Sequence, residues 1–212
     1  MNWNVQIVMC VVCCTFLCLN DSGAQNSAES LFEEAQRYHL GLDQPVDYAR
    51  AFTLYKQVVL ADPNYKDAYY NMAHICLSQK RYDLAITYYK RVISINPEDS
   101  DAYNNLGTVY QRQGDLDNAK RAYAKAIQLN RDLALAYYNL TYIFLKEGDK
   151  TRAEKSISEA LRLESDNADF LKLQSQVLGE VGKISDWWAV VAFGGFGGII
   201  VGYYLLFGRK GV

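Results

Sequence analysis

The chain of 212 residues carries 22 lysines and arginines against 24 aspartates and glutamates, which gives a formal net charge of -2. This near balance lacks the basic surplus of nucleic-acid-binding proteins, so no nucleic-acid partner is expected. Four of the five cysteines, Cys10, Cys13, Cys14 and Cys18, lie near the amino terminus, so Cys76 has no partner for an intrachain disulfide in the rest of the chain.

The first 24 residues have the pattern of a signal peptide. Residues 7–19 are apolar over about the length of a signal-peptide core, which is too short for a comfortable membrane span. Ser22, Gly23 and Ala24 then place small residues before a cut after Ala24. The first four residues carry no Lys or Arg, so an uncleaved anchor is the alternative to the cleaved signal that we predict for residues 1–24.

The middle of the chain repeats itself. Residues 66–99, 100–133 and 134–167 align without gaps, at a period of 34 residues. The windows share identical residues in four columns, namely Ala68, Ala102 and Ala136; Tyr69, Tyr103 and Tyr137; Asn71, Asn105 and Asn139; and Ala85, Ala119 and Ala153. A fixed period of this length indicates stacked helical hairpins.

In period and in motif, the three windows resemble the tetratricopeptide repeat. The matching columns are Met72, Leu106 and Leu140; the small residues Ala73, Gly107 and Thr141; Gly114 and Gly148; Tyr89, Tyr123 and Ile157; and Pro97. Lys80 replaces the usual Gly, Cys76 the usual Tyr, and Arg131 and Ser165 the usual Pro, which weakens individual turns. The resemblance implies an all-α fold, an α-solenoid of helix-turn-helix repeats wound into a right-handed superhelix.

Two further segments extend the array. Residues 25–65 give a first unit whose helices are joined by a longer loop, residues 41–47, and this elongated unit resembles Sel1-like repeats. Residues 168–183 repeat the first-helix pattern once more, and we interpret them as the capping helix that covers the last apolar face of such an array.

Short signals mark the turns and the packing within each repeat. Gly114-Asp115 and Gly148-Asp149 predict a left-handed helix stop followed by an N-cap. Ala85, Ala119 and Ala153 are small, as expected where paired helices approach closely.

The resemblance also implies a concave groove, lined by the first helix of each repeat, that binds another protein or an extended peptide. The groove positions carried over to this sequence are Asp67, Tyr70, Asn71 and His74; Asp101, Asn104, Asn105, Thr108 and Gln111; and Tyr138, Asn139 and Tyr142. None of them is Lys or Arg, which excludes the cationic clamp with which some members grip a terminal carboxylate.

The evenly spaced Asn71, Asn105 and Asn139 are similar to the asparagine ladder with which some family members hold an extended peptide. A carboxamide offers both a donor and an acceptor, so it pairs with a peptide bond whatever side chain follows. The alternative is that these asparagines serve helix packing, and the sequence leaves both interpretations open.

No catalytic motif and no cofactor-binding motif occurs in the sequence, so no enzyme activity and no cofactor are expected. His74 has no second His, Cys or spaced acid around it in the sequence pattern, so we expect a surface contact and not a metal site. Cys76 falls on the packing side of its helix and is expected to be a small core residue.

The carboxyl-terminal region has the pattern of a membrane span. Residues 189–207 contain no charged side chain, and as a helix they would measure about 28 Å, close to the hydrocarbon thickness of a bilayer. Trp187 and Trp188 precede this run, and Arg209 and Lys210 follow it. We therefore predict a transmembrane helix at residues 187–207, a short cytoplasmic tail at 208–212, and repeats on the extracytoplasmic, periplasmic side of a bacterial cell envelope.

Gly194, Gly198 and Gly202 fall four residues apart, on one face of this predicted helix. Such a stripe favours close helix packing within the lipid bilayer, either with a second copy of the chain or with another protein. Ordinary tolerance of glycine in membrane helices is the alternative.

Taken together, these patterns predict a non-enzymatic, membrane-anchored adaptor or scaffold that binds a protein or peptide partner in its groove. The alternative is a structural or assembly subunit of a membrane protein complex that associates through its glycine-rich helix.

Overall fold

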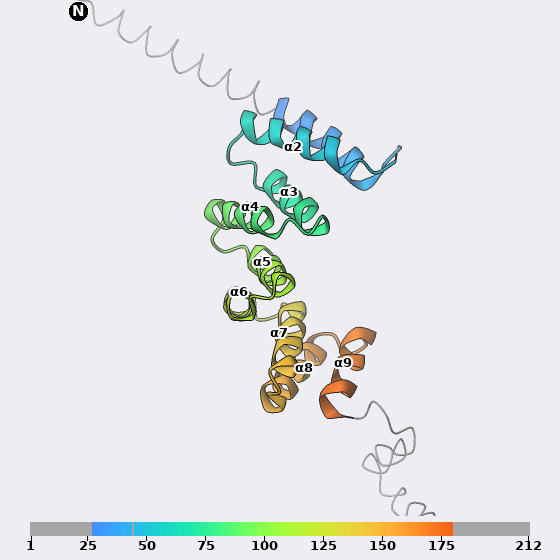
Figure 1. Cartoon of the computed structure of the whole chain (residues 1–212), viewed down its shortest axis with the longest axis vertical. Coiled ribbons are helices and arrows are strands. Elements are labelled where there is room, and N and C mark those ends of the chain that lie inside the picture. Colours follow the sequence, from blue (N-terminus) through green and yellow to red (C-terminus); the bar gives the residue numbers. More distant parts are fainter. Residues whose placement is uncertain (1–26, 44, 180–212) are drawn as a thin grey trace, which may run out of the picture. The chain divides into compact units, whose positions relative to one another are not determined.

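The computed structural model describes residues 27–43 and 45–179, and this part of the chain is helical, with no strand (Figure 1). A helix over residues 27–40 is followed by α2 (Tyr48–Ala61), α3 (Lys66–Ser78), α4 (Tyr82–Ile95), α5 (Ser100–Gln113), α6 (Leu116–Leu129), α7 (Ala134–Lys146), α8 (Lys150–Leu163) and α9 (Ala168–Leu178). The predicted signal peptide and the predicted transmembrane helix with its three glycines lie outside the described residues. Within these residues, no helix has both the length and the apolar character that crossing a bilayer requires.

The helices pack on their neighbours in sequence, as the all-α solenoid prediction requires. The chain divides into two compact units, with the boundary between Asn139 and Leu140 inside α7. In the first unit α2 packs on α3, α3 on α4, α4 on α5 and α5 on α6; in the second unit α8 packs on α9. Contacts between sequence neighbours are the defining property of a repeat array, so the prediction of an all-α repeat solenoid is confirmed.

The predicted turn signals are found where the helices end and begin. Gly114 and Gly148 adopt left-handed conformations, with φ of 93° and 77°. The carboxylates that follow then cap the next helices: Asp115 accepts a hydrogen bond from the backbone N–H of Asn118, and Asp149 accepts one from that of Arg152. These bonds satisfy N–H groups that a helix cannot pair internally, so the same two residues stop one helix and start the next.

Lys80 occupies the equivalent turn between α3 and α4, where the other two repeats have glycine. Its φ is 60°, so a residue with a Cβ has been held in the left-handed region. This conformation costs an L-residue about 1–2 kcal/mol. The departure from the family pattern at Lys80 is therefore accommodated by backbone strain and not by a different turn.

Tyrosines of the second helices form the centre of the first unit. Tyr55 of α2, Tyr89 of α4 and Tyr123 of α6 are equivalent residues of successive repeats, and each is fully buried. The alanines at Ala85 and Ala119 are also completely buried, as their predicted packing role requires.

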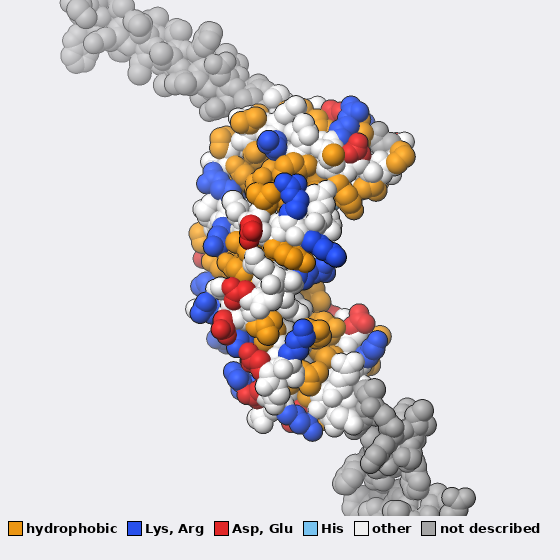
Figure 2. All heavy atoms as spheres, in the orientation of Figure 1, with side chains coloured by type: hydrophobic (Ala, Val, Ile, Leu, Met, Phe, Trp, Pro, Cys, Tyr) orange, Lys and Arg blue, Asp and Glu red, His pale blue; other side chains and the backbone are white. Residues whose placement is uncertain are grey.

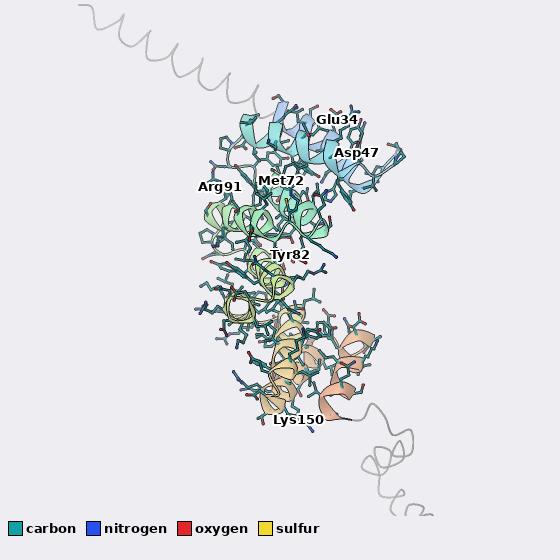
Figure 3. The ribbon with its side chains drawn as sticks, in the orientation of Figure 1. Glu34, Asp47, Met72, Tyr82, Arg91 and Lys150 are labelled. Atoms are coloured by element: carbon teal, nitrogen blue, oxygen red, sulfur yellow. The ribbon has the colours of Figure 1, made fainter. Side chains whose placement is uncertain are left out.

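Met72, labelled in Figure 3, shows how adjacent repeats share a core. It lies in α3 and belongs to the same buried cluster as Leu54 and Val58 of α2. Arg91, at the end of α4 in the same figure, lies over the ring of Tyr69 at 5.6 Å and donates to the carbonyl of Pro63. Apolar burial and the bond from Arg91 to Pro63 join this repeat to the one before it, whereas the contact of Arg91 with Tyr69 lies within the repeat.

Gly107 lets α5 and α6 approach each other closely. A Cβ added at this position would lie 2.7 Å from two ring carbons of Tyr123. Tyr123 is fully buried, and its hydroxyl donates to Gln111 Oε1 and lies close to Thr108 Oγ1, so its ring cannot withdraw easily. The small residue predicted at this column is a steric requirement of the tyrosine opposite.

The last described helix, α9, lies in the second unit and packs on α8. Asn167 caps its first turn, and Gly179 follows its last residue in a left-handed conformation. Its buried side chains are Phe170, Leu173 and Val177, spaced as one apolar face of a helix. Such a single helix buries the face that the preceding repeat would otherwise expose.

Candidate functional site

The candidate site is the outward side of the first helices α3 and α5, which we call the first-helix face. It consists of Asp67, Tyr70, Asn71 and His74 of α3 together with Asp101, Asn104, Asn105, Thr108 and Gln111 of α5. The start of α5 is fixed by Asp99, which accepts a hydrogen bond from the N–H of Ala102. Because both helices start at the same point of the repeat, equivalent residues face the same way.

The exposure of these residues differs more than the repeat pattern implies. Asp67, His74 and Asp101 are exposed, and most of the others are partly buried. Asn104, predicted to line the groove, is only 7% exposed and accepts a hydrogen bond from Asn139. It lies beneath the surface because its oxygen is used by the next helix.

The three ladder asparagines each donate a hydrogen bond to the preceding repeat. Asn71 Nδ2 donates to the hydroxyl of Tyr55 at 3.1 Å, and Asn139 Nδ2 donates to Asn104 Oδ1 at 3.1 Å. Asn105 Nδ2 donates to the hydroxyl of Tyr70. The packing role that the sequence left open is therefore present at all three positions. In each case the bond uses the amide nitrogen.

The buried tyrosines lie directly under this row of polar groups. The Tyr55 hydroxyl accepts from Asn71 and lies 3.2 Å from His39 Nδ1. The Tyr123 hydroxyl donates to Gln111 Oε1 at 2.7 Å, with Thr108 Oγ1 at 3.2 Å. Burial raises the pKa of Tyr55 and of Tyr123 to about 12, so both are neutral hydroxyls at physiological pH.

Tyr89 differs from its two equivalents. Its hydroxyl is buried and has no hydrogen-bond partner among the described residues. Its ring meets that of Tyr70 edge-on at a centroid distance of 5.6 Å. An unpaired buried hydroxyl costs about 1–3 kcal/mol, so this one requires an explanation.

The structure corrects the prediction that His74 has no histidine near it. The ring of His39 lies 5.9 Å from that of His74, between centroids. Burial, and then the charge of His74, lower the pKa of His39. The alignment of the three 34-residue repeats could not reveal this pair, because His39 belongs to the helix of residues 27–40, which lies outside those repeats. Two imidazoles remain short of a metal site: the described residues contain no group of three or more potential ligands.

The amino-terminal ends of α3 and α5 carry an excess of negative charge. Lys66 Nζ donates to Asp99 Oδ2 at 2.8 Å, which balances that carboxylate. Asp67 and Asp101 are exposed, and Lys66, which also interacts with the charge of Asp67, sets one positive charge against these three carboxylates. Burial raises the pKa of Tyr70, and the nearby charges of Asp101 and Asp99 raise it further.

Tyr142 was also predicted to line the groove, and it belongs to the second unit. It is 38% exposed, and Lys146 Nζ lies 5.0 Å above the centre of its ring. This cation–π contact holds the ring at the helix surface. Tyr138 and Asn139, in the preceding turn of α7, are partly buried.

A hollow of about 380 Å³ lies elsewhere in the first unit. It is lined by Ser30, Glu33, Glu34, Arg37, Tyr38, Leu42 and Asp43, from the helix of residues 27–40 and the turn after it. None of these belongs to the first-helix face. On the side shown in Figure 2, acidic and basic side chains are interspersed over the described residues.

Solved structures with a similar fold carry sequences that are moderately or distantly related. The crystal structure of MamA is 28% identical, with a TM-score of 0.60, covering 68% of this chain and 82% of that one. A structure of MamA from Desulfovibrio magneticus RS-1 is 26% identical, with a TM-score of 0.59, covering 68% of this chain and 79% of that one. PilF of Pseudomonas aeruginosa is 17% identical, with a TM-score of 0.66, covering 90% of this chain and 79% of that one, and at this identity the likeness concerns the fold alone.

Comparison with curated proteins gave no match. Four family models match the chain: a TPR repeat model at residues 73–114 and tetratricopeptide repeat models at residues 54–87, 100–133 and 134–167. Together they extend over more than half of the 212 residues, and the chain therefore belongs to the tetratricopeptide repeat proteins, whose extended surfaces bind other proteins.

Proposed function

We propose that this protein is a non-enzymatic adaptor that is anchored in a membrane and binds an extended segment of a partner protein along its first-helix face. The observation that carries the proposal is the regular row of polar and aromatic side chains on α3 and α5. Equivalent residues recur every 34 positions on a scaffold that the buried tyrosines hold rigid. A repeating row of this kind matches the repeating peptide bonds of an extended chain.

The chemistry of the described side chains supports binding in preference to catalysis. Cys76 is a free, fully buried cysteine. Burial raises the pKa of its thiol, and Arg81 opposes this effect in part. A buried thiol with a raised pKa is a poor nucleophile, so Cys76 serves as a small core residue.

Site-specific photo-crosslinking tests the binding face without disturbing its hydrogen bonds. A crosslinking residue is placed at exposed first-helix positions, His74 or Asp101, or at exposed positions of the second helix α4, Thr87 or Lys90. Irradiation in native membranes should attach the same partner from the first two positions and not from the second two. Equal attachment from α4 would contradict the proposal.

The membrane part of the proposal rests on the sequence of residues 187–207, on the cations that follow, and on the signal pattern of residues 1–24. Both terminal patterns favour repeats on the extracytoplasmic, periplasmic side. The full chain should resist extraction by alkaline carbonate, and added protease should degrade the repeats once the outer barrier is permeabilised. Release by carbonate, or protection of the repeats, would count against this placement.

A structural or assembly subunit of a membrane complex is the second candidate, and the spacing of Gly194, Gly198 and Gly202 favours it. Gly198→Leu should dissociate such a complex and leave crosslinking at His74 unchanged. Ile200→Leu is the matched control, since it changes a neighbouring position off the glycine stripe.

A further inference from the structure

We infer that the partner segment is basic, with lysine or arginine side chains that lie against the amino-terminal ends of α3 and α5. This inference rests on the proposed function and specifies the chemistry of its ligand. It follows from an account of which hydrogen-bonding atoms the first-helix face has already used and which it leaves to a ligand.

The internal hydrogen bonds of the asparagines use their amide N–H groups and leave their carbonyl oxygens available. Asn71, Asn105 and Asn139 all donate through Nδ2 to the preceding repeat, and among the described residues none of their Oδ1 atoms accepts a hydrogen bond. A carboxamide in this state has its carbonyl oxygen and a single N–H left. The row therefore offers mainly acceptors, and a ligand that matches it must bring donors.

The charges on the same helices point the same way. Asp67, Asp99 and Asp101 supply three carboxylates near the helix starts. Lys66 pairs with Asp99 and also interacts with the charge of Asp67, so its single positive charge offsets one of the three negative charges. A carboxylate accepts hydrogen bonds and donates none. The peptide N–H groups of a ligand would donate hydrogen bonds to these acceptors. Its lysine or arginine side chains would supply the positive charge that complements the carboxylates.

The unpartnered hydroxyl of Tyr89 is a separate sign of a ligand at the second repeat. In the next repeat the equivalent hydroxyl of Tyr123 is paired with Gln111. The residue equivalent to Gln111 here is Leu77, whose side chain has no polar atom. The Tyr89 hydroxyl therefore has no partner in the described part of the chain, and its ring meets that of Tyr70 edge-on. A donor group inserted beside Tyr70 would supply the missing hydrogen bond.

Within α5, the single cation lies at the opposite end of the helix from Asp101. Arg112 is in the last turn of α5, eleven residues after Asp101, which is about 16 Å along the helix axis. This distance exceeds the screening length of about 8 Å at physiological salt, so Arg112 does not cancel the negative charge at the helix starts.

Three synthetic peptides of equal length test the inference on the full chain in a neutral detergent. Every second residue is Lys in the first peptide, Gln in the second and Glu in the third, and fluorescence anisotropy measures binding. The Lys peptide should bind tightest, and added salt should weaken its binding. The double variant Asp67→Asn and Asp101→Asn should weaken it about tenfold, the effect of two exposed ion pairs.

The matched control is the double variant Asp117→Asn and Asp132→Asn, which removes the same charge from two exposed positions outside α3 and α5 and should leave affinity unchanged. Thermal melting of both variants confirms that they are folded. Binding of the Gln or Glu peptide as tight as that of the Lys peptide, or equal losses in both double variants, would overturn the inference. If the Gln or Glu peptide binds as tightly and still crosslinks from His74, the inference fails but the proposed function stands. If the peptide crosslinks from α4 instead, the proposed function fails as well.

Discussion

At the scale of single residues, the fold depends on close contacts that tolerate little change. Gly107 faces the ring of Tyr123, and Lys80 holds a left-handed turn. Each position has an equivalent residue in another repeat, with which the effect of a substitution can be compared.

Gly107→Ala should destabilise the protein. In an exposed helix this change gains about 1 kcal/mol from helix propensity. Here the new methyl would lie 2.7 Å from the Tyr123 ring, and overpacking of this kind costs about 1–3 kcal/mol. Urea denaturation should show a net loss of stability. A gain would mean that the Tyr123 ring moves aside freely, contrary to its burial and its hydrogen bond to Gln111.

Lys80→Gly should stabilise the protein by about 1 kcal/mol, because glycine adopts a φ of 60° without strain. Gly114→Ala is the converse change in the next repeat, where φ is 93°, and it should destabilise. The two denaturation midpoints should move in opposite directions. A shift of the same sign in both would refute the strain at Lys80.

The sequence predicted where the ladder asparagines lie but could not predict their bonding. Spacing placed Asn71, Asn105 and Asn139 on one face, whereas their internal partners come from the preceding repeat, about 16 or 35 residues away. The burial of Asn104 follows from one of those bonds. Which side chain on a neighbouring helix a residue contacts depends on how the two helices pack. The 34-residue period of the sequence does not contain this information.

At the scale of elements, the asparagines join neighbouring helices. The bond between Asn105 of α5 and Tyr70 of α3 connects successive repeats. Asn105→Ala and Tyr70→Phe, singly and together, should give a coupling free energy of about 1 kcal/mol in urea denaturation. Strictly additive effects would show that the pair does not stabilise the array.

The contact between the helix of residues 27–40 and α3 should be sensitive to pH. The pKa of His39 is lowered in the folded state, so the unfolded chain binds more protons once the pH falls below about 6.5, the ordinary pKa of histidine. Stability is therefore full above that pH and falls as the pH drops through the folded pKa. Because one proton is involved, the slope cannot exceed about 1.4 kcal/mol per pH unit.

Two variants test whether His39 and His74 cause this pH dependence of the stability. His39→Asn should reduce the loss of stability between neutral and mildly acidic pH, and His74→Gln should reduce it by a smaller amount, since burial is the larger cause. Tyr48 and Tyr55 also meet the His39 ring, and burial raises the pKa of Tyr55 to about 12, so that hydroxyl stays neutral over this range. An unchanged slope in His39→Asn would refute the assignment.

At the scale of the whole molecule, one period was enough to predict the fold. The 34-residue repeat implied paired helices, and the caps at Asp115 and Asp149 and the buried columns of Ala85 and Tyr89 are found in the structure. The first unit was predicted at residues 25–65 but departs from the strict period, so the contact of His39 with His74 was not predicted. A repeat pattern predicts what recurs and cannot predict a contact that occurs once.

The central claim is that the first-helix face binds a partner polypeptide. The most direct measurement is the amount of partner attached by photo-crosslinking from His74 relative to that from Lys90, in the full chain in its native membrane. The account predicts a strong product at His74 and none at Lys90. Equal products, or a product at Lys90 alone, would contradict it.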